Sequence, residues 1–287
     1  MLALVLSLQL ADPAAITRTG VFASPRVKES SGIAVSRTHR GLLWTHNDSG
    51  DGPYLYATDT TGADRGARRL PVDDPIDWED MAEGPCPATP GRCLYVADTG
   101  DNDQRRASVN VHAVPEPDPP GGPADTSGVT AAPLTLRLRY PDAPHDVEAI
   151  FVTPAGELYL VSKGRTPPVR VFRVPRDAWR STGVVTATLV QGLGIPVERD
   201  DGRRVTAAAL SPSGRTVAVR TYTSIHFFSL RPDGRLTAAG ACELGRLEPQ
   251  GEAITFLDDA TVLLASEGPG PLAGPLYKVR CAFDRPT

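Results

Sequence analysis

The feature that most constrains the fold of this chain is a pattern that it repeats five times. Each repeat holds a short apolar strand that opens on an acidic or polar residue, then a turn, then a second apolar strand that ends in polar residues. The first strands open at Glu29, Glu79, Glu148, Thr206 and Glu252. The second strands cover residues 43–48, 94–99, 158–163, 217–222 and 262–267. Strand repeats of about 40–50 residues are typical of a β-propeller, in which each repeat forms one blade around a common axis.

Further strands complete the predicted blades. An alternating third strand follows in every repeat, and a fourth is visible at residues 134–140, 184–190 and 236–240. The last repeat lacks a fourth strand, and we expect Gly20–Ala23 to supply it and close the ring, because closure removes exposed strand edges. The stretch Glu116–Thr130 is rich in Pro, Gly and Asp, so we interpret it as a loop, which favours five blades over six. The prediction is an all-β chain with a single propeller domain over residues 20–287.

Charge excludes one class of partner. The chain has 30 Lys and Arg against 34 Asp and Glu, which gives a net charge of −4 and a pI near 5.8. Nucleic-acid-binding domains carry a basic patch, so a nucleic acid is not expected as a partner. We expect a monomer that binds a small-molecule ligand or substrate at one end of the propeller axis.

Residues 1–19 form a segment of different character. Met1 to Leu10 is an apolar run that is too short to span a membrane and resembles the apolar region of a secretory signal without its basic leader. The alternatives are a mis-assigned start or an N-terminal strand that packs on the domain. No other segment of the sequence approaches membrane-spanning length. The signal-like start favours a secreted or extracytoplasmic protein.

The chain has four cysteines, an even number. Cys86 and Cys93 flank a tight turn between two strands, where a hairpin brings its ends close enough for a disulfide. Cys242 and Cys281 lie in the last two repeats, where a disulfide would join neighbouring blades. The spacing matches no zinc pattern. Two disulfides would agree with an oxidising compartment, and the alternative is four reduced, buried thiols.

Superposing the repeats brings polar residues from all of them to one end of the axis. Glu29, Glu79, Glu148 and Glu252 then form a ring, and Asn47 and Asp98 lie at the ends of neighbouring second strands, in loops rich in Asp, Asn and Gly. Like charges at short range raise one another's pKa, so a cation, a basic side chain or protons must neutralise such a ring. Oxygen ligands suit Ca²⁺, and we interpret these six residues as its candidate ligands. The alternative is that the glutamates cap strands and pair with arginines.

Catalytic and substrate-binding candidates lie near the same end. His46 and His145 are the nearest histidines by register, and His145 precedes Asp146, so either is a candidate general base. Lys163 and Arg220 end second strands among acidic neighbours, where they would hold a phosphate or carboxylate or simply balance the ring. The sequence contains no nucleophile elbow, phosphate loop or zinc-protease motif.

Several motifs together resemble those of a group of bacterial secreted propellers. The motifs are Glu29-Ser-Ser-Gly-Ile-Ala, Trp44-Thr-His-Asn-Asp-Ser-Gly, Asp77-Trp-Glu-Asp-Met-Ala, Ala97-Asp-Thr-Gly-Asp-Asn, Asp146-Val-Glu-Ala and Gly251-Glu-Ala-Ile. The group is related to the "esterase-like activity of phytase" and TolB-like propellers. The acidic ring is also similar, more distantly, to that of the paraoxonase, gluconolactonase and β-propeller phytase groups. These groups use calcium to polarise an ester or phosphate oxygen.

Two function hypotheses follow from the ring and the resemblance. The first is a calcium-dependent hydrolase that acts on a small ester, lactone or phosphate, in which the ion polarises an oxygen and a histidine activates water. The second is a non-catalytic module that binds a ligand or protein and in which calcium is structural.

Overall fold

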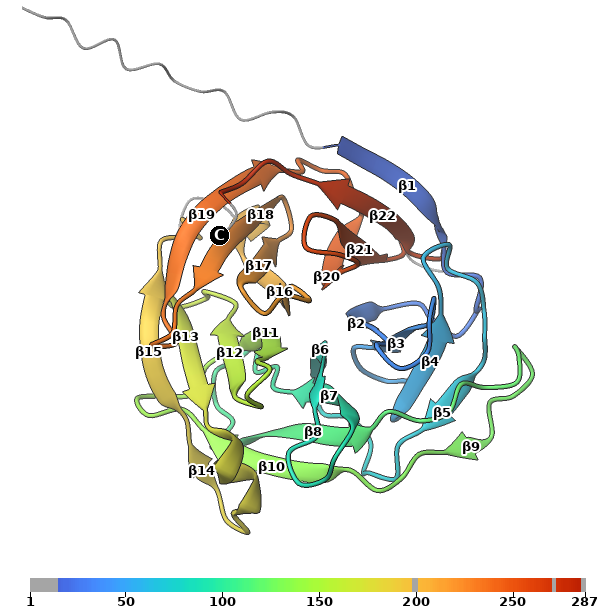
Figure 1. Cartoon of the computed structure of the whole chain (residues 1–287), viewed down its shortest axis with the longest axis horizontal. Coiled ribbons are helices and arrows are strands. Elements are labelled where there is room, and N and C mark those ends of the chain that lie inside the picture. The colour runs from blue at the N-terminus through green and yellow to red at the C-terminus, as the bar shows by residue number, and fades with distance from the viewer. Residues whose placement is uncertain (1–14, 198–200, 270–271, 285–287) are drawn as a thin grey trace, which may run out of the picture.

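Five β-sheets stand around a common axis, as the five repeats predict (Figure 1). The computed structural model describes residues 15–197, 201–269 and 272–284. In each sheet the first strand of the repeat lies nearest the axis, and the following strands pair outward in antiparallel order. The all-β fold class and the number of blades are therefore as predicted.

The described strands are distributed over the blades as follows. Blade one contains β2 (Ser30–Val35), β3 (Leu43–Asn47), β4 (Tyr54–Thr58) and β5 (Ala67–Arg69), with β9 (Gly128–Val129) parallel to β5. Blade two contains β6 (Trp78–Pro85), β7 (Arg92–Asp98), β8 (Val109–Pro115) and β10 (Leu134–Arg139), with β14 (Val185–Thr186) parallel to β10. Blade three contains β11 (Val147–Val152), β12 (Leu158–Ser162), β13 (Val169–Val174) and β15 (Thr188–Leu193). Blade four contains β16 (Val205–Leu210), β17 (Thr216–Thr221), β18 (Ser224–Leu230) and β19 (Leu236–Glu243).

Blade five is built from both ends of the chain. It contains β20 (Gln250–Phe256), β21 (Val262–Glu267), β22 (Pro275–Arg280) and the N-terminal β1 (Ala15–Val21). β1 pairs with β22 in antiparallel register and closes the ring, as predicted. The strand begins at Ala15 rather than Gly20, so the last residues of the predicted signal-like segment belong to the propeller. The apolar run Met1–Leu10 lies outside the described residues.

The hydrophobic core is divided among the five seams between neighbouring blades. Each of the five clusters of buried apolar side chains draws from two adjacent blades. In the seam between blades two and three, for example, Leu138 of β10 and Leu160 of β12 belong to one cluster. Burying such a side chain contributes about 1.5–3 kcal/mol, so each blade is held mainly by its two neighbours. This ring of cores keeps the inner strands at fixed positions around the axis.

Two disulfides and two short 3₁₀ helices complete the described structure. Cys86 pairs with Cys93 across the β6–β7 hairpin, and Cys242 of blade four pairs with Cys281 of blade five, as predicted. The helices are η1 (Arg176–Arg180) and η2 (Asp201–Arg203). Within the described ranges, no helix has the length and apolar character needed to cross a membrane. The disulfides are typical of proteins in an oxidising compartment.

Candidate metal site

A one-residue shift in strand register recurs in every blade at the end of the axis where the first strands begin. Residues at or next to the ends of the second strands pair with Ser30, Trp78, Val147, Val205 and Gly251 of the first strands. The register shifts by one directly after these residues. The extra residue of such a bulge is released from the regular ladder. The residues at this ring position are Ser31, Glu79, Glu148, Thr206 and Glu252.

The pairing corrects the predicted place of Glu29. Because Ser30 pairs with Asn47, Ser31 takes the ring position of blade one, and Glu29 lies two residues earlier. Glu29 is exposed and is equivalent to Asp77 and Asp146 rather than to the ring glutamates. Aligning Glu29 with the glutamates of the other repeats led to a two-residue error, because the register of a strand depends on its partner strand and not on its own sequence.

Backbone hydrogen bonds between blades bring each second strand next to the following ring position. The N–H of Trp78 donates to the carbonyl of Asp48 at 3.2 Å, and the N–H of Val205 donates to the carbonyl of Lys163 at 3.1 Å. In these blades the residue after the second strand therefore lies beside the first strand of the next blade. In this way Asp48 of blade one reaches Glu79 of blade two.

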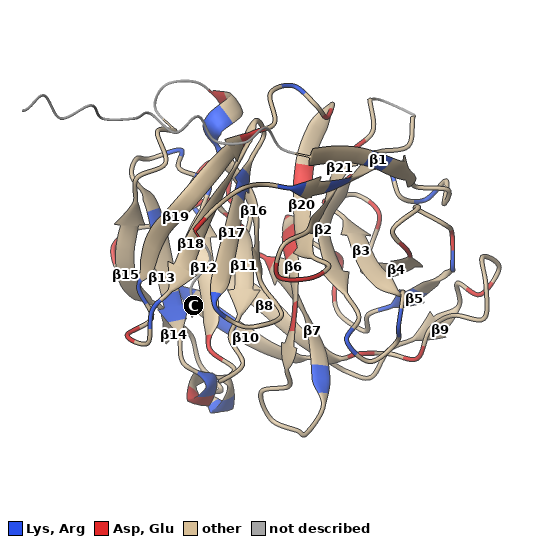
Figure 2. Cartoon of the chain, turned by 45° about the horizontal axis from the view of Figure 1, so that its top comes forward, with Lys and Arg blue, Asp and Glu red and all other residues tan. Residues whose placement is uncertain are grey.

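Five carboxylates form two adjoining groups at this end of the axis. Asp48, Asp77 and Glu79 make one group, and Glu79, Asp146 and Glu148 make the other. In each group, one carboxylate oxygen from each residue lies within 4.8 Å of the others. Glu79 is common to both, and it is buried, as are Asp146 and Glu148. Figure 2 shows acidic residues, in red, on the inner strands around the axis.

Basic side chains compensate part of this charge. The ammonium of Lys163 lies 2.5 Å from Oε1 of Glu148 in a buried ion pair. Burial alone would lower the pKa of Lys163, but Glu148 and the other acidic neighbours raise it, so the ammonium stays protonated. Asp146 pairs with Arg165 and also accepts the N–H of Asp101 at 2.8 Å.

The charged forms of the remaining carboxylates are destabilised by burial and by mutual repulsion. Burial, followed by repulsion from Glu148, raises the pKa of Glu79 well above its usual value. Burial and the neighbouring Asp77 raise the pKa of Asp48 to about 7, and burial raises that of Glu267 to about 8. Such shifts mean that the charged forms lack sufficient compensation from the protein. A cation bound among these oxygens would supply it.

The fifth blade contributes an incompletely bonded carboxylate. Oε1 of Glu252 accepts a hydrogen bond from the Gln250 side chain at 3.0 Å. Oε2 of Glu252 is buried, and no residue in the described part of the chain hydrogen-bonds to it. An unpaired buried oxygen in an oxygen-rich set fits a hard cation such as Ca²⁺.

A glycine allows the backbone to pass close to two of the other carboxylates. A Cβ on Gly100 would collide with the carboxylates of Glu79 and Asp77.

Asn47 and Asp98, two of the predicted ligands, are engaged in strand-end contacts. Oδ1 of Asn47 accepts the N–H groups of Lys28 and Glu29, both at 3.0 Å, and its amide donates to Asp51 at 2.8 Å. Asp98 forms an ion pair with Arg106 at 2.9 Å. Asp98 belongs to neither carboxylate group, and the amide of Asn47 is taken up by the strand-end loop, so we leave both residues out of the proposed ligand set.

The two predicted catalytic histidines lie apart from the carboxylate groups. His46 is fully buried, its Nδ1 is 2.9 Å from the carbonyl oxygen of Asn47, and its ring packs edge-on against Trp78. His145 is buried, its Nε2 lies 2.9 Å from Asp142, and its ring packs against aromatic neighbours. Among the described residues, neither imidazole contacts a carboxylate of the two groups. Sequence register placed them at the correct end but could not show which way they point.

Of the two predicted substrate-binding cations, only Lys163 borders the carboxylates. Arg220 is fully buried, with Nη2 2.6 Å from Glu248 and Nη1 2.9 Å from the carbonyl oxygen of Ala253. These contacts tie blade four to blade five and leave Arg220 no free donor face for a substrate. The sequence signal that marks the better ligands is the position of Asp77 and Asp146, two residues before ring glutamates, and of Asp48 after a second strand.

Comparisons with known proteins identify no family for this chain. No family model matches it, and neither does any curated protein. Among solved structures, it is similar to a gluconolactonase, XC5397 from Xanthomonas campestris, with 17% identity and a TM-score of 0.46 over 94% of this chain and 95% of that one. It is also similar to a glucose dehydrogenase, with 11% identity and a TM-score of 0.48 over 93% and 100% of the two chains. Likeness at this level carries no argument about function, and the resemblance to phytase-like and TolB-like propellers stays a prediction.

Proposed function

We propose that this propeller binds Ca²⁺ at the acidic end of its axis and hydrolyses a small ester, lactone or phosphate there. The observation that carries the proposal is the pair of adjoining carboxylate groups that share the buried Glu79. Asp48, Asp77 and Asp146 would join Glu79 and Glu148 as ligands, with the unpaired oxygen of Glu252 as a further candidate. An all-oxygen set of this kind favours Ca²⁺ over zinc, which prefers nitrogen and sulfur.

The roles of the protein groups follow from their positions. The chemistry that Ca²⁺ supplies in such a site is polarisation of a carbonyl or phosphoryl oxygen. Lys163 places a positive charge beside the same carboxylates and would orient the anionic part of a substrate. The five seams of the fold hold the inner strands rigid, so these groups need little rearrangement when substrate binds.

We also propose that the protein works outside the cytoplasm. The two disulfides support this, since such bonds persist in oxidising compartments. Calcium sites of extracellular modules have dissociation constants of about 10⁻⁴–10⁻³ M, which an incompletely compensated carboxylate cluster would meet.

The second candidate is a non-catalytic binding module with structural calcium. The observation that favours it is the position of the histidines, because neither described imidazole contacts the carboxylate groups where a water would be activated. Both candidates share the ion and differ in turnover, so one set of variants separates them.

The test is Glu148→Gln, with Glu157→Gln as the matched control at the other end of the same β-hairpin. Calcium binding is measured by calorimetry and by thermal melts with and without EDTA, and turnover is measured on ester, lactone and phosphate panels. At free Ca²⁺ about one hundred times Kd, binding adds about 2.7 kcal/mol of stability. We expect Glu148→Gln to weaken binding by at least about tenfold and to abolish turnover, with Glu157→Gln unchanged.

Each outcome has a defined meaning. A wild-type protein that binds no calcium and whose melting temperature ignores EDTA would refute the metal site. Calcium binding that Glu148→Gln weakens, without turnover in the wild type, would establish the binding module in place of the hydrolase.

A further inference from the structure

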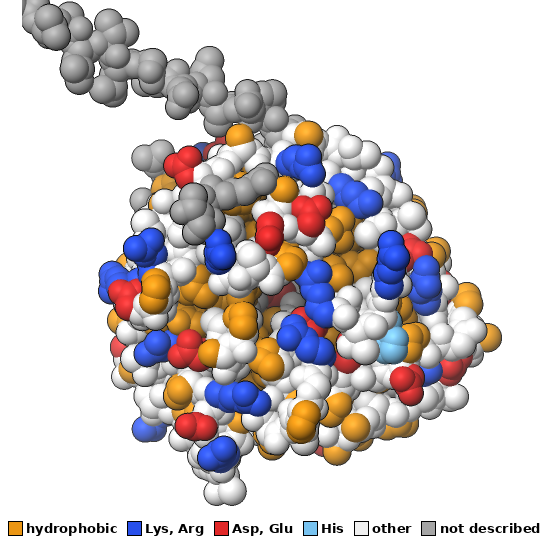
Figure 3. Space-filling model, viewed as in Figure 1, with side chains coloured by type: hydrophobic (Ala, Val, Ile, Leu, Met, Phe, Trp, Pro, Cys, Tyr) orange, Lys and Arg blue, Asp and Glu red, His pale blue; other side chains and the backbone are white. Residues whose placement is uncertain are grey.

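The end of the axis opposite the carboxylates holds a cavity that the proposed function does not use. Its volume is about 410 Å³, and all five inner strands, β2, β6, β11, β16 and β20, contribute to its wall. Pockets that bind small molecules typically enclose about 300–1,000 Å³. Figure 3 shows this face of the propeller, with apolar and basic side chains around the hollow at its middle.

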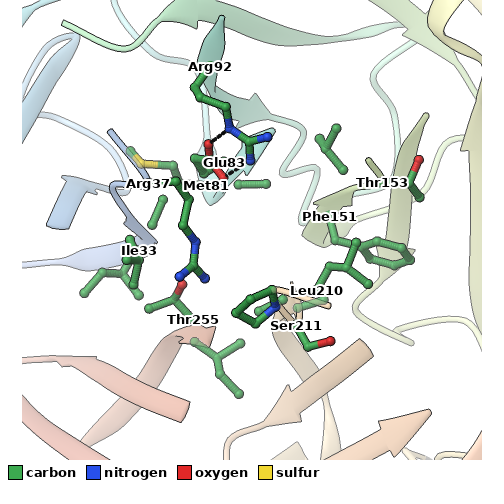
Figure 4. Close-up of a pocket in the computed structure, with 18 of the residues that line it drawn as sticks. Ile33, Arg37, Met81, Glu83, Arg92, Phe151, Thr153, Leu210, Ser211 and Thr255 are labelled. Carbon is green, nitrogen blue, oxygen red and sulfur yellow. Dashed lines mark hydrogen bonds and ion pairs between the residues drawn. The ribbon is translucent and has the colours of Figure 1, made fainter. Parts of the chain in front are cut away.

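The wall is apolar in its body and polar at its rim. Apolar side chains that line it include Ile33, Met81, Phe151 and Leu210. Hydroxyl groups at the rim come from Thr153, Ser211 and Thr255. Figure 4 shows these residues arranged around the open centre. Such a lining suits a ligand with an apolar body and one polar end.

Two arginines at the mouth differ in how their charges are compensated. Arg92 forms a two-point ion pair with Glu83 (Figure 4). Arg37 donates one hydrogen bond from Nη2 to the carbonyl oxygen of Phe256 at 3.0 Å. No carboxylate of the described residues lies within ion-pair distance of Arg37. The mouth therefore has one guanidinium whose charge is not paired.

The guanidinium of Arg37 is also placed to meet a ligand. Its side chain extends from the turn after β2 along the edge of the open centre, and its guanidinium ends beside Thr255 (Figure 4). Burial is the largest influence on the pKa of Arg37 and lowers it, and the nearby carboxylates do not offset this fully. An arginine fork without a carboxylate partner matches a ligand's carboxylate, which accepts N–H bonds on both of its oxygens.

We propose that this cavity binds a small organic monocarboxylate with an apolar body, whose carboxylate pairs with Arg37. The charge distribution favours an anion with one carboxylate, since Glu83 forms its ion pair with Arg92 and acts on Arg37, like Asp259, only from beyond ion-pair distance. A cationic ligand would meet unpaired positive charge at the mouth. A dianion such as a phosphate monoester would find only one uncompensated arginine.

The cavity is separate from the metal site. Asp80, between them, is fully buried, and its Oδ2 accepts the N–H groups of Ile150 at 2.9 Å and Ala208 at 3.1 Å. These bonds reach from blade two to blades three and four, so Asp80 crosses the channel between the two ends. Its side chain and these bonds therefore separate a ligand at the mouth, beside Arg37, from the carboxylates at the other end of the axis. Binding here should therefore not depend on calcium.

The test uses octanoate as the probe, with octanol and octylammonium as matched neutral and cationic analogues. Calorimetry is done on the full protein in EDTA and in Ca²⁺. We expect octanoate to bind one to one and both analogues to bind at least about tenfold more weakly. Arg37→Gln should raise Kd for octanoate by about tenfold or more and leave that for octanol unchanged. Arg40→Gln, an exposed arginine that does not line the cavity, is the control and should behave as wild type.

The proposal has clear refutations. It is overturned if octanoate does not bind, if octanol binds as tightly, or if Arg37→Gln leaves octanoate affinity unchanged. Should Arg37→Gln fail to fold, Arg37→Lys retains the charge and must still prefer octanoate to octylammonium. If Glu148→Gln abolishes octanoate binding, the ligand binds at the other end of the axis, and the proposal is also overturned. Octanoate binding in EDTA would support it even if no calcium site exists.

Discussion

His46 should make the protein sensitive to acid. Its ring is fully buried. Nδ1 forms a hydrogen bond with the backbone carbonyl of Asn47, whereas Nε2 is buried and has no hydrogen-bond partner among the described residues. Burial lowers its pKa from the usual 6.5 to about 4, against backbone hydrogen bonds that raise it. The imidazole is therefore neutral in the folded protein over most of the accessible pH range.

The sign and size of the effect follow from linkage. The folded pKa is lower than the unfolded one, so between about pH 6.5 and pH 4 the unfolded chain binds the extra proton. The contribution is complete above about pH 6.5 and is lost as pH falls through this window. From about pH 7.5 to pH 4.5, His46 alone should remove about 2.5 kcal/mol from the free energy of unfolding.

The assay is denaturant unfolding at both pH values for wild type, His46→Gln and His39→Gln. Glutamine does not titrate, so His46→Gln should lower stability at neutral pH but lose about 2.5 kcal/mol less than wild type on acidification. His39 lies in the surface turn between β2 and β3, and its variant should follow wild type. If His46→Gln and wild type lose the same free energy, or if His46 titrates near pH 6.5 by NMR, the argument from burial is wrong.

Two further substitutions test the contacts that cross between blades. The carboxylate of Asp80 accepts backbone N–H groups from three blades, with Met81 on Oδ1 and Ile150 and Ala208 on Oδ2. Asp80→Asn replaces one of these oxygens with an NH₂ group that cannot accept them, and should cost about 1–3 kcal/mol by denaturant unfolding, whereas Asp118→Asn on the surface should cost nothing measurable. Arg220→Met leaves the buried Glu248 without its ion-pair partner and should lower the free energy of unfolding by about 3–5 kcal/mol. Adding Glu248→Gln should recover part of this loss. If the double variant recovers nothing, an unpaired buried charge is not the cause.

Much of the fold is predictable because its signals are local and repeated. Apolar strands at a regular spacing identify the blades, and the missing fourth strand of the last repeat implies closure by the N-terminus. Both disulfides follow from the positions of their cysteines in this arrangement. The short β9 and β14 are not predicted, because two-residue parallel strands carry no periodicity.

The candidate site is predictable only in part. Equivalent positions in the repeats reveal the end of the axis where Glu79, Glu148 and Glu252 gather. The register of blade one is set by the pairing of Ser30 with Asn47. The sequence does not reveal this pairing, because the acidic residue at position 29 resembles the ring glutamates of the other repeats. The direction of a side chain at a bulge depends on neighbouring blades. His46 and Arg220 therefore looked available in the sequence but are buried among residues from other repeats.

Closure of the ring by β1 affects the order in which the blades can fold during synthesis. Ala15 pairs with Arg280, and Thr19 donates to the carbonyl oxygen of Leu276 at 3.4 Å across 257 positions of sequence. β1 thus leaves the ribosome long before its partner strand β22 has been made. Four blades can form before β22 is made, but the fifth must wait for that strand. A chain whose synthesis stops before β22 leaves an open ring with unpaired strand edges, which can pair with other chains.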